Sequence, residues 1–181
     1  DISTVDFAVI SHGHNDHGGG LSHFLAHNKK ATVYVNETAF DNYFVKREEF
    51  HPIGLDQSIK HHPQIQLVNQ DYKGESFSIF AGVTGDNCRP TGNGTLYMQK
   101  ENGPTLDDFT HEQNLALWED GKSVLICGCA HNGILNILET FKSKFECYPD
   151  VVIGGFHLYN PSTKQDESPE VVAQIAASMM N

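Results

Sequence analysis

Positive charge is scarce in this chain. It has 12 lysine and arginine residues against 23 aspartate and glutamate residues, which gives a net charge of −11 at pH 7. A groove that binds nucleic acid, or a surface that binds anionic lipid, needs clustered positive charge. The acidic balance therefore argues against both kinds of partner. The sequence also lacks an apolar run of about 18 residues, the length that a bilayer crossing requires, so we expect no membrane-spanning segment.

Cysteine is sparse as well. The four cysteines do not show the spacing of a small disulfide-rich domain, which favours reduced thiols in a cytoplasmic protein; they are Cys88, Cys127, Cys129 and Cys147. Hydrophobic residues make up 39% of the chain and aromatic residues 10%, enough for a packed core. The length of 181 residues predicts one domain, residues 1–181.

Histidine is concentrated in one short segment. Residues 11–19 read Ser-His-Gly-His-Asn-Asp-His-Gly-Gly and follow an apolar run, residues 5–10, that is typical of a buried strand. Histidine and carboxylate side chains are the ligands that zinc, iron or manganese take in hydrolytic sites. Two histidines spaced i and i+2 project from one side of an extended backbone, and the next two donors lie where a helix begins. Donors from two directions favour a two-metal cluster; they are His12, His14, Asp16 and His17.

Further histidines follow other predicted strands. Residues 114–119 and 122–127 flank Asp120-Gly121, a two-residue turn of the hairpin type, and His131 comes after the second strand. The apolar segment Val151–Ile153 precedes His157. Mixed α/β architectures gather such side chains at the ends of strands. We therefore expect these histidines to converge with the first cluster.

Two regions show no clear periodicity. Residues 37–63 are predicted to be irregular with some helix. Residues 86–108 are rich in glycine, asparagine, proline and threonine, which indicates a long surface loop that either covers a substrate or is simple surface decoration. Ser168 and Pro169 favour the start of a final helix.

Residues 11–19 match the His-x-His-x-Asp-His signature of the metallo-β-lactamase fold superfamily, which the chain therefore resembles. Residues 128–134 and 154–158, with the acidic segments 107–109 and 112–115, are similar to one branch, the 7,8-dihydropterin-6-methyl-4-(β-D-ribofuranosyl)-aminobenzene-5′-phosphate synthase-like proteins. The resemblance implies an αββα sandwich with the metal site at one edge between two sheets. Members carry about two more strands before the equivalent of Asp1 and a later histidine, so we expect a sandwich that is truncated at both ends.

The resemblance also implies a set of ligands. His12 and His14 would bind a first metal, with His131 as the third ligand. His111 is the rival for that third position, and we favour His131 because the residues around it match the branch. Asp16 and His17 would bind a second metal.

Two more residues are assigned to this site by resemblance. Cys129 occupies the place where many relatives have a bridging aspartate, so it would either ligate directly or line the site. His157 would be a ligand or a substrate contact. Because the second set of ligands is incomplete, we expect one well-formed metal position and a weaker neighbour.

The implied function is that of a metal-dependent hydrolase, or a related condensing enzyme, that uses a metal-bound hydroxide on a small anionic substrate of phosphorylated or pterin type. Zn²⁺ is the expected ion, in one or two copies, with iron or manganese as alternatives. Asp16 would orient the hydroxide and accept its proton, and His157 would hold an anionic group or protonate the leaving group. The alternatives are a di-iron oxidoreductase on the same fold and a non-catalytic metal-binding fragment.

Overall fold

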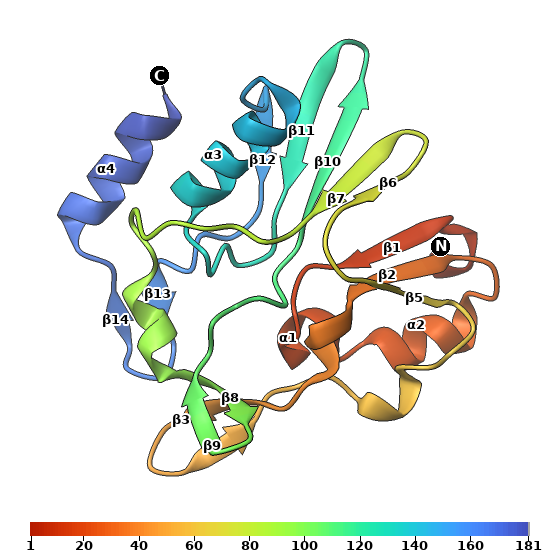
Figure 1. The fold of residues 1–181 in the computed structure, drawn as a ribbon, viewed down its shortest axis with the longest axis horizontal. Coiled ribbons are helices and arrows are strands. Elements are labelled where there is room, and N and C mark those ends of the chain that lie inside the picture. Colours follow the sequence, from red (N-terminus) through yellow and green to blue (C-terminus); the bar gives the residue numbers. More distant parts are fainter. Residues whose placement is uncertain (181) are drawn as a thin grey trace.

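The computed structural model describes residues 1–180, and its centre consists of two β-sheets that face each other (Figure 1). The first sheet has three parallel strands in the order β1-β2-β5. The apolar side chains of β1 and β2 alternate between its two faces. Ile10, Val33 and Val35 pack on the helical side with Leu21 and Leu25. The strands and helices of this half are β1 (Phe7–Ile10), α1 (Asn15–Gly18), α2 (Leu21–His27), β2 (Thr32–Asn36) and β5 (Ile65–Val68).

The second sheet has five strands in the order β12-β11-β10-β7-β6. Its outer face packs on two helices through a cluster that includes Leu125, Ile137 and Phe141. Its inner face meets the first sheet, where Phe7 stacks on Phe77 with ring centroids 4.4 Å apart. The elements are β6 (Tyr72–Lys73), β7 (Phe77–Phe80), β10 (Asn114–Glu119), β11 (Lys122–Ile126), α3 (Ile134–Phe145), β12 (Val151–Ile153) and α4 (Pro169–Met179). Helix, sheet, sheet and helix form the predicted αββα sandwich, which is thereby confirmed.

Two local predictions of secondary structure are also confirmed. β10 and β11 form an antiparallel hairpin, and the two turn residues Asp120 and Gly121 have φ of 50° and 75°. Positive φ at both positions matches the right-handed twist of the strands. At the start of α4, the Ser168 hydroxyl accepts the N–H of Val171, and Pro169 occupies the first turn.

The prediction of a long loop at residues 86–108 is wrong. This region contains η4 (Thr91–Thr95) and the hairpin β8 (Leu96–Lys100) and β9 (Gly103–Leu106). β8 pairs with β3 (Tyr43–Lys46), which in turn pairs with β4 (Phe50–Pro52), so residues 37–63 also hold two strands. The pairing partner of β8 lies far away in the sequence, and its short apolar stretch therefore carried little local signal. This small sheet lies at one end of the sandwich (Figure 1).

The edge strand β12 exposes part of its apolar surface. Val151 and Ile153 are 43% and 53% exposed, whereas Val152 between them packs toward α3 and α4. Successive strand residues alternate between faces, so the two exposed side chains lie on the inner face of the second sheet. The first sheet therefore does not cover this edge of the second sheet.

The remaining elements are short. They are η1 (Ile2–Thr4), η2 (Glu37–Phe40), η3 (Gln57–Ile59), β13 (Tyr159–Asn160) and β14 (Gln165–Asp166). Within residues 1–180, none of the helices combines the length and the apolar character that a bilayer crossing requires.

Candidate metal centre

The histidine segment lies directly after β1, where the chain turns into α1. His12 and His14 are buried, and their ring centroids are 4.7 Å apart. Gly13 between them has no room for a side chain, because a Cβ would come within 2.6 Å of the Ala39 carbonyl oxygen and 2.7 Å of Tyr43 Cε2. The glycine therefore lets the backbone pass close to η2 and β3, which directs both flanking histidines inward.

His131 reaches the same place from the loop after β11. Its ring centroid lies 4.9 Å from that of His12 and 5.0 Å from that of His14. The His131 ring also stacks on Phe109, with centroids 4.6 Å apart and an interplanar angle of 7°. Three imidazoles from two segments more than 100 residues apart thus converge.

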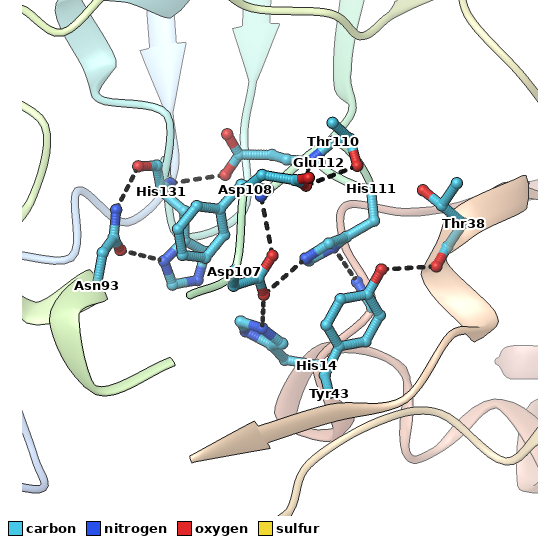
Figure 2. Close-up of polar contacts among 12 residues, drawn as sticks. His14, Thr38, Tyr43, Asn93, Asp107, Asp108, Thr110, His111, Glu112 and His131 are labelled. Atoms are coloured by element: carbon cyan, nitrogen blue, oxygen red, sulfur yellow. Dashed lines mark hydrogen bonds and ion pairs between the residues drawn. The ribbon is translucent and has the colours of Figure 1, made fainter. Parts of the chain in front are cut away.

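Asn93 fixes the orientation of the His131 ring (Figure 2). The Asn93 side chain donates its Nδ2–H to the His131 carbonyl oxygen at 2.7 Å and accepts the His131 Nδ1–H at 2.9 Å. The proton on Nδ1 leaves a lone pair on Nε2, and this atom is buried and has no hydrogen-bond partner among the described residues. His12 Nε2 is also buried without a hydrogen-bond partner among the described residues, whereas its Nδ1 lies 3.0 Å from the Ser11 hydroxyl oxygen.

Buried nitrogen atoms without partners are costly, so the two free Nε2 atoms call for an explanation. His12, His131 and Cys129 form a group in which one potential ligand atom of each residue, a ring nitrogen or the sulfur, lies within 4.8 Å of the other two. Imidazole nitrogen and thiolate sulfur are the donors that zinc prefers. The residues present therefore fit a divalent cation.

His14 and His111 both contact one carboxylate oxygen. His14 Nε2 lies 3.2 Å and His111 Nε2 3.1 Å from Asp107 Oδ2, and all three side chains are in the interior (Figure 2). Burial by itself would raise the pKa of Asp107, but the hydrogen bonds from His111 and His14 outweigh it and hold that pKa well below its ordinary value. Asp107 is therefore ionised and accepts from both rings.

The two rings differ at their other nitrogen. His111 Nδ1 accepts the backbone N–H of Gly13 at 2.8 Å, so both of its nitrogens are occupied. His14 donates through Nε2, which leaves its Nδ1 with a lone pair. His14, Asp107 and His111 also have potential ligand atoms within 4.8 Å of one another, but hydrogen bonds to Gly13 and Asp107 already occupy both nitrogens of His111, which therefore lies behind the cluster.

Asp16 and His17 lie on α1 beside the three converging rings. Each contributes a ligand atom within 4.8 Å of the other and of a nitrogen of His12. His17 Nε2 is 3.1 Å from the Cys129 sulfur. Their side chains are 69% and 30% exposed, so this second group faces solvent whereas the first is buried.

His157 follows β12 and has a φ of 50°. Its ring centroid lies 4.3 Å from that of His131, and its side chain is half-buried. Burial lowers its pKa, which favours the neutral imidazole. His157 therefore lies beside His131, near the site as the sequence predicts. It does not belong to either of the two ligand groups described above.

Glu112 has a role that sequence analysis did not assign. Its buried carboxylate accepts the backbone N–H of His131 at 2.7 Å, and the backbone and side-chain N–H groups of Asn132 at 3.0 and 2.9 Å. Burial raises its pKa. Glu112 therefore holds the loop that carries His131, as Asp107 and Asn93 hold the rings. Only the folded loop brings these partners together, so spacing gives no signal for them.

A cavity of about 420 Å³ opens above the site. Its floor contains His14, Asp16, Cys129, His131 and His157. Its walls come from the small sheet and from the β13–β14 hairpin. The cavity gives a small molecule access to both ligand groups.

Comparisons with known proteins agree with this arrangement. The sequence profile of the metallo-β-lactamase superfamily matches residues 1–176. In Methanocaldococcus jannaschii, the uncharacterized protein MJ0448 is 28% identical over an alignment of 172 positions that covers 87% of this chain and 59% of that protein. In the same organism, 7,8-dihydropterin-6-methyl-4-(β-D-ribofuranosyl)-aminobenzene-5′-phosphate synthase is 24% identical over 174 residues, with 90% and 59% covered.

A similar solved structure is that of Tm1679, described as a metal-dependent hydrolase of the β-lactamase superfamily. The TM-score is 0.73 at 27% identity, and the match covers 94% of this chain and 62% of that one. The chain thus spans about three fifths of the length of these relatives. The similarity to the synthase confirms the predicted resemblance to that branch. Since the superfamily profile matches nearly the whole sequence, the chain belongs to the metallo-β-lactamase superfamily.

Proposed function

We propose that this chain forms the metal-binding part of a metal-dependent hydrolase, or of a related condensing enzyme, that acts on a small anionic substrate. The observation that carries the proposal is the pair of buried, partnerless Nε2 atoms on His12 and His131. Beside them, Asp107 leaves the Nδ1 of His14 free.

We assign the first metal position to His12, His14 and His131. His111 is the weaker candidate, because hydrogen bonds to Gly13 and Asp107 occupy both of its nitrogens. Three histidines with an open fourth position are the ligand set of catalytic zinc. A cation held there supplies Lewis-acid polarisation and a hydroxide at neutral pH.

Asp16 and His17 are assigned to a second, weaker position, and Cys129, whose sulfur lies 3.1 Å from His17 Nε2, either ligates there or lines the site. Burial, followed by the charges of Asp16 and Glu112, raises the pKa of the Cys129 thiol to about 11, so the thiol is protonated without a neighbouring cation. Binding at this position must therefore release a proton from Cys129 if the sulfur ligates. The exposed carboxylate of Asp16 can orient a water molecule and accept its proton.

The half-buried His157 faces the same cavity and is proposed to hold an anionic group or to protonate a leaving group. A cavity of about 420 Å³ is in the size range of small-molecule sites, which supports a small substrate over a macromolecule. The named activity of the synthase relative makes a phosphorylated or pterin-type compound the first class to test. All four cysteines are unpaired, which supports the proposed cytoplasmic location.

Hydrolysis of bis(p-nitrophenyl) phosphate with added Zn²⁺, Mn²⁺ or Fe²⁺ tests the proposal. We expect metal-dependent turnover that a chelator abolishes, and that falls at least about a hundredfold in His131→Ala. His27→Ala is the matched control, because His27 is exposed on α2. Equal activity in the wild type and His131→Ala would overturn the assignment. Elemental analysis of protein purified without added metal separates zinc from iron, and zinc would argue against a di-iron oxidoreductase.

A further inference from the structure

The cavity above the metal centre has one charged group of each sign. Arg47 is the one lysine or arginine among its lining residues, and Asp16 is the one carboxylate. Of the lining histidines, His14 and His131 serve as neutral ligands when a metal binds, and burial favours the neutral form of His157 by lowering its pKa. Asp16 belongs to the second ligand group on the floor, so Arg47 is the cavity's remaining permanent charge.

The Arg47 side chain is not engaged elsewhere. Arg47 lies in the turn between β3 and β4, where its backbone N–H donates to the Glu49 carbonyl at 3.1 Å. Its guanidinium forms no hydrogen bond or ion pair with any residue in the described range 1–180. By contrast, the neighbouring Lys46 places its Nζ 4.3 Å from the centroid of the Phe50 ring, and it does not line the cavity.

β3 leads from the metal centre, where the Tyr43 ring centroid lies 5.8 Å from that of His14, through Val45 to the turn that holds Arg47. The cavity lining has mixed polarity: Val45, Ile53, Leu96, Tyr159 and Pro161 are apolar, whereas Asn15, Thr95, Asn160 and Ser162 are polar. A molecule that fills the cavity would therefore contact the ligand groups with one end and apolar side chains with its middle. Its other end would reach the guanidinium.

We propose that Arg47 binds an oxyanion group, a carboxylate or a phosphate, at the end of the substrate distal to the reacting bond. This inference rests on the proposed function and describes the substrate further. The substrate would have a reacting group at one end, an apolar middle and an oxyanion at the other end. The planar guanidinium matches carboxylate and phosphate geometry with two parallel N–H donors. In a chain of net charge −11, a free arginine here also offsets the general repulsion of an anion.

Thiol probes can test both ends of the cavity at once, because a thiolate ligates zinc. The probes are mercaptohexanoate and mercaptomethyl benzoate, each compared with its neutral amide, plus the phosphonate analogue of the benzoate. Dissociation constants are measured by calorimetry on the zinc-loaded protein at low ionic strength. The variants are Arg47→Gln, Arg47→Lys, and Lys46→Gln as the control that removes an equal charge one residue away.

The wild type should bind at least one anionic probe about five- to tenfold more tightly than its neutral amide. Arg47→Gln should abolish that difference, Arg47→Lys should keep part of it, and Lys46→Gln should keep all of it. The ratio of phosphonate to carboxylate affinity then identifies the preferred oxyanion.

Two outcomes would overturn the inference, and they differ. In the first, all thiols bind in a zinc-dependent way, but the anionic probes bind no more tightly than their amides, or they still bind more tightly than their amides in Arg47→Gln. The assignment of Arg47 to a distal subsite would then be wrong, and the proposed metal site would be unaffected. In the second, no thiol binds in a zinc-dependent way, which would contradict both the proposed function and the proposed subsite.

Discussion

The Nε2–H of His14 donates to Oδ2 of Asp107 over 3.2 Å in the interior of the protein. This hydrogen bond fixes the proton of His14 on Nε2 and leaves a lone pair on Nδ1, in a ring whose centroid lies 4.7 and 5.0 Å from those of His12 and His131. The same oxygen accepts from His111, which closes the arrangement by accepting the N–H of Gly13. A ligand histidine held by a carboxylate through its second nitrogen is the common arrangement around bound zinc.

Replacement of Asp107 should weaken metal binding without removing a ligand. In Asp107→Asn, one amide group faces two histidine N–H groups, so the His14 tautomer is no longer fixed. We expect zinc affinity, measured by calorimetry, to fall roughly ten- to a hundredfold. Asp108→Asn is the control, because Asp108 is exposed and bonds to Thr110 and Lys100. Equal affinity in Asp107→Asn and the wild type would refute the role assigned to Asp107.

The two candidates for the third ligand should respond differently. His131→Ala removes a buried free Nε2 and should reduce the amount of zinc that remains bound after gel filtration to the level of a weak site. His111→Ala removes a residue behind the cluster and should lower affinity while leaving the stoichiometry at saturating zinc unchanged. The reverse pattern, with stoichiometry lost only in His111→Ala, would exchange the two assignments.

Acidification should destabilise the metal-free protein. Burial lowers the pKa of His12, His14 and His131 below the value of 6.5 that they have when unfolded. The unfolded chain therefore binds more protons below that pH. The free energy of unfolding falls as the pH drops through this range, by about 1.4 kcal/mol per pH unit for each histidine that titrates. The lowered pKa of Asp107 adds stability above pH 3.8 that is lost below it.

Urea unfolding in the presence of a chelator, in steps from about pH 8 to about pH 4, measures this dependence. His131→Asn should show a shallower slope than the wild type, because one of the buried imidazoles is gone. Stability that stays constant or rises between pH 6.5 and pH 5 would contradict the burial of neutral histidines.

Loss of the Glu112 carboxylate should loosen the loop that carries His131. Glu112→Gln replaces one acceptor oxygen with a donor, which then faces an N–H of His131 or Asn132. We expect a loss of about 1–3 kcal/mol in the free energy of unfolding, together with weaker zinc binding. Glu119→Gln, at the end of β10, is exposed and should change neither quantity. A variant at Glu112 as stable as the one at Glu119 would contradict this role.

Residue patterns predicted the central elements because those elements have local causes. The buried strand before His12, the Asp120-Gly121 turn and the Ser168 cap each depend on a few neighbouring residues. The β3–β8 pairing depends on residues about 50 positions apart, and the composition of residues 86–108 indicated a loop instead. The same contrast between neighbouring and distant partners applies to the residues of the metal centre.

The predicted ligands His12 and His14 are neighbours in a short signature and could be found by inspection. The side chains that hold the rings could not, because Asn93, Asp107 and Glu112 become partners of the histidines only when three loops meet. Arg47 is a comparable case: it is an ordinary turn residue in the sequence, and only the cavity distinguishes it from Lys46.

The most direct test of a histidine-built metal centre is a calorimetric zinc titration of the wild type beside the double variant His12→Ala/His131→Ala, with circular dichroism to verify that both are folded. The account predicts tight zinc binding in the wild type and its loss in the double variant, since both partnerless nitrogens are removed. Weak or absent binding in the wild type, or binding of equal strength in the folded double variant, would contradict it.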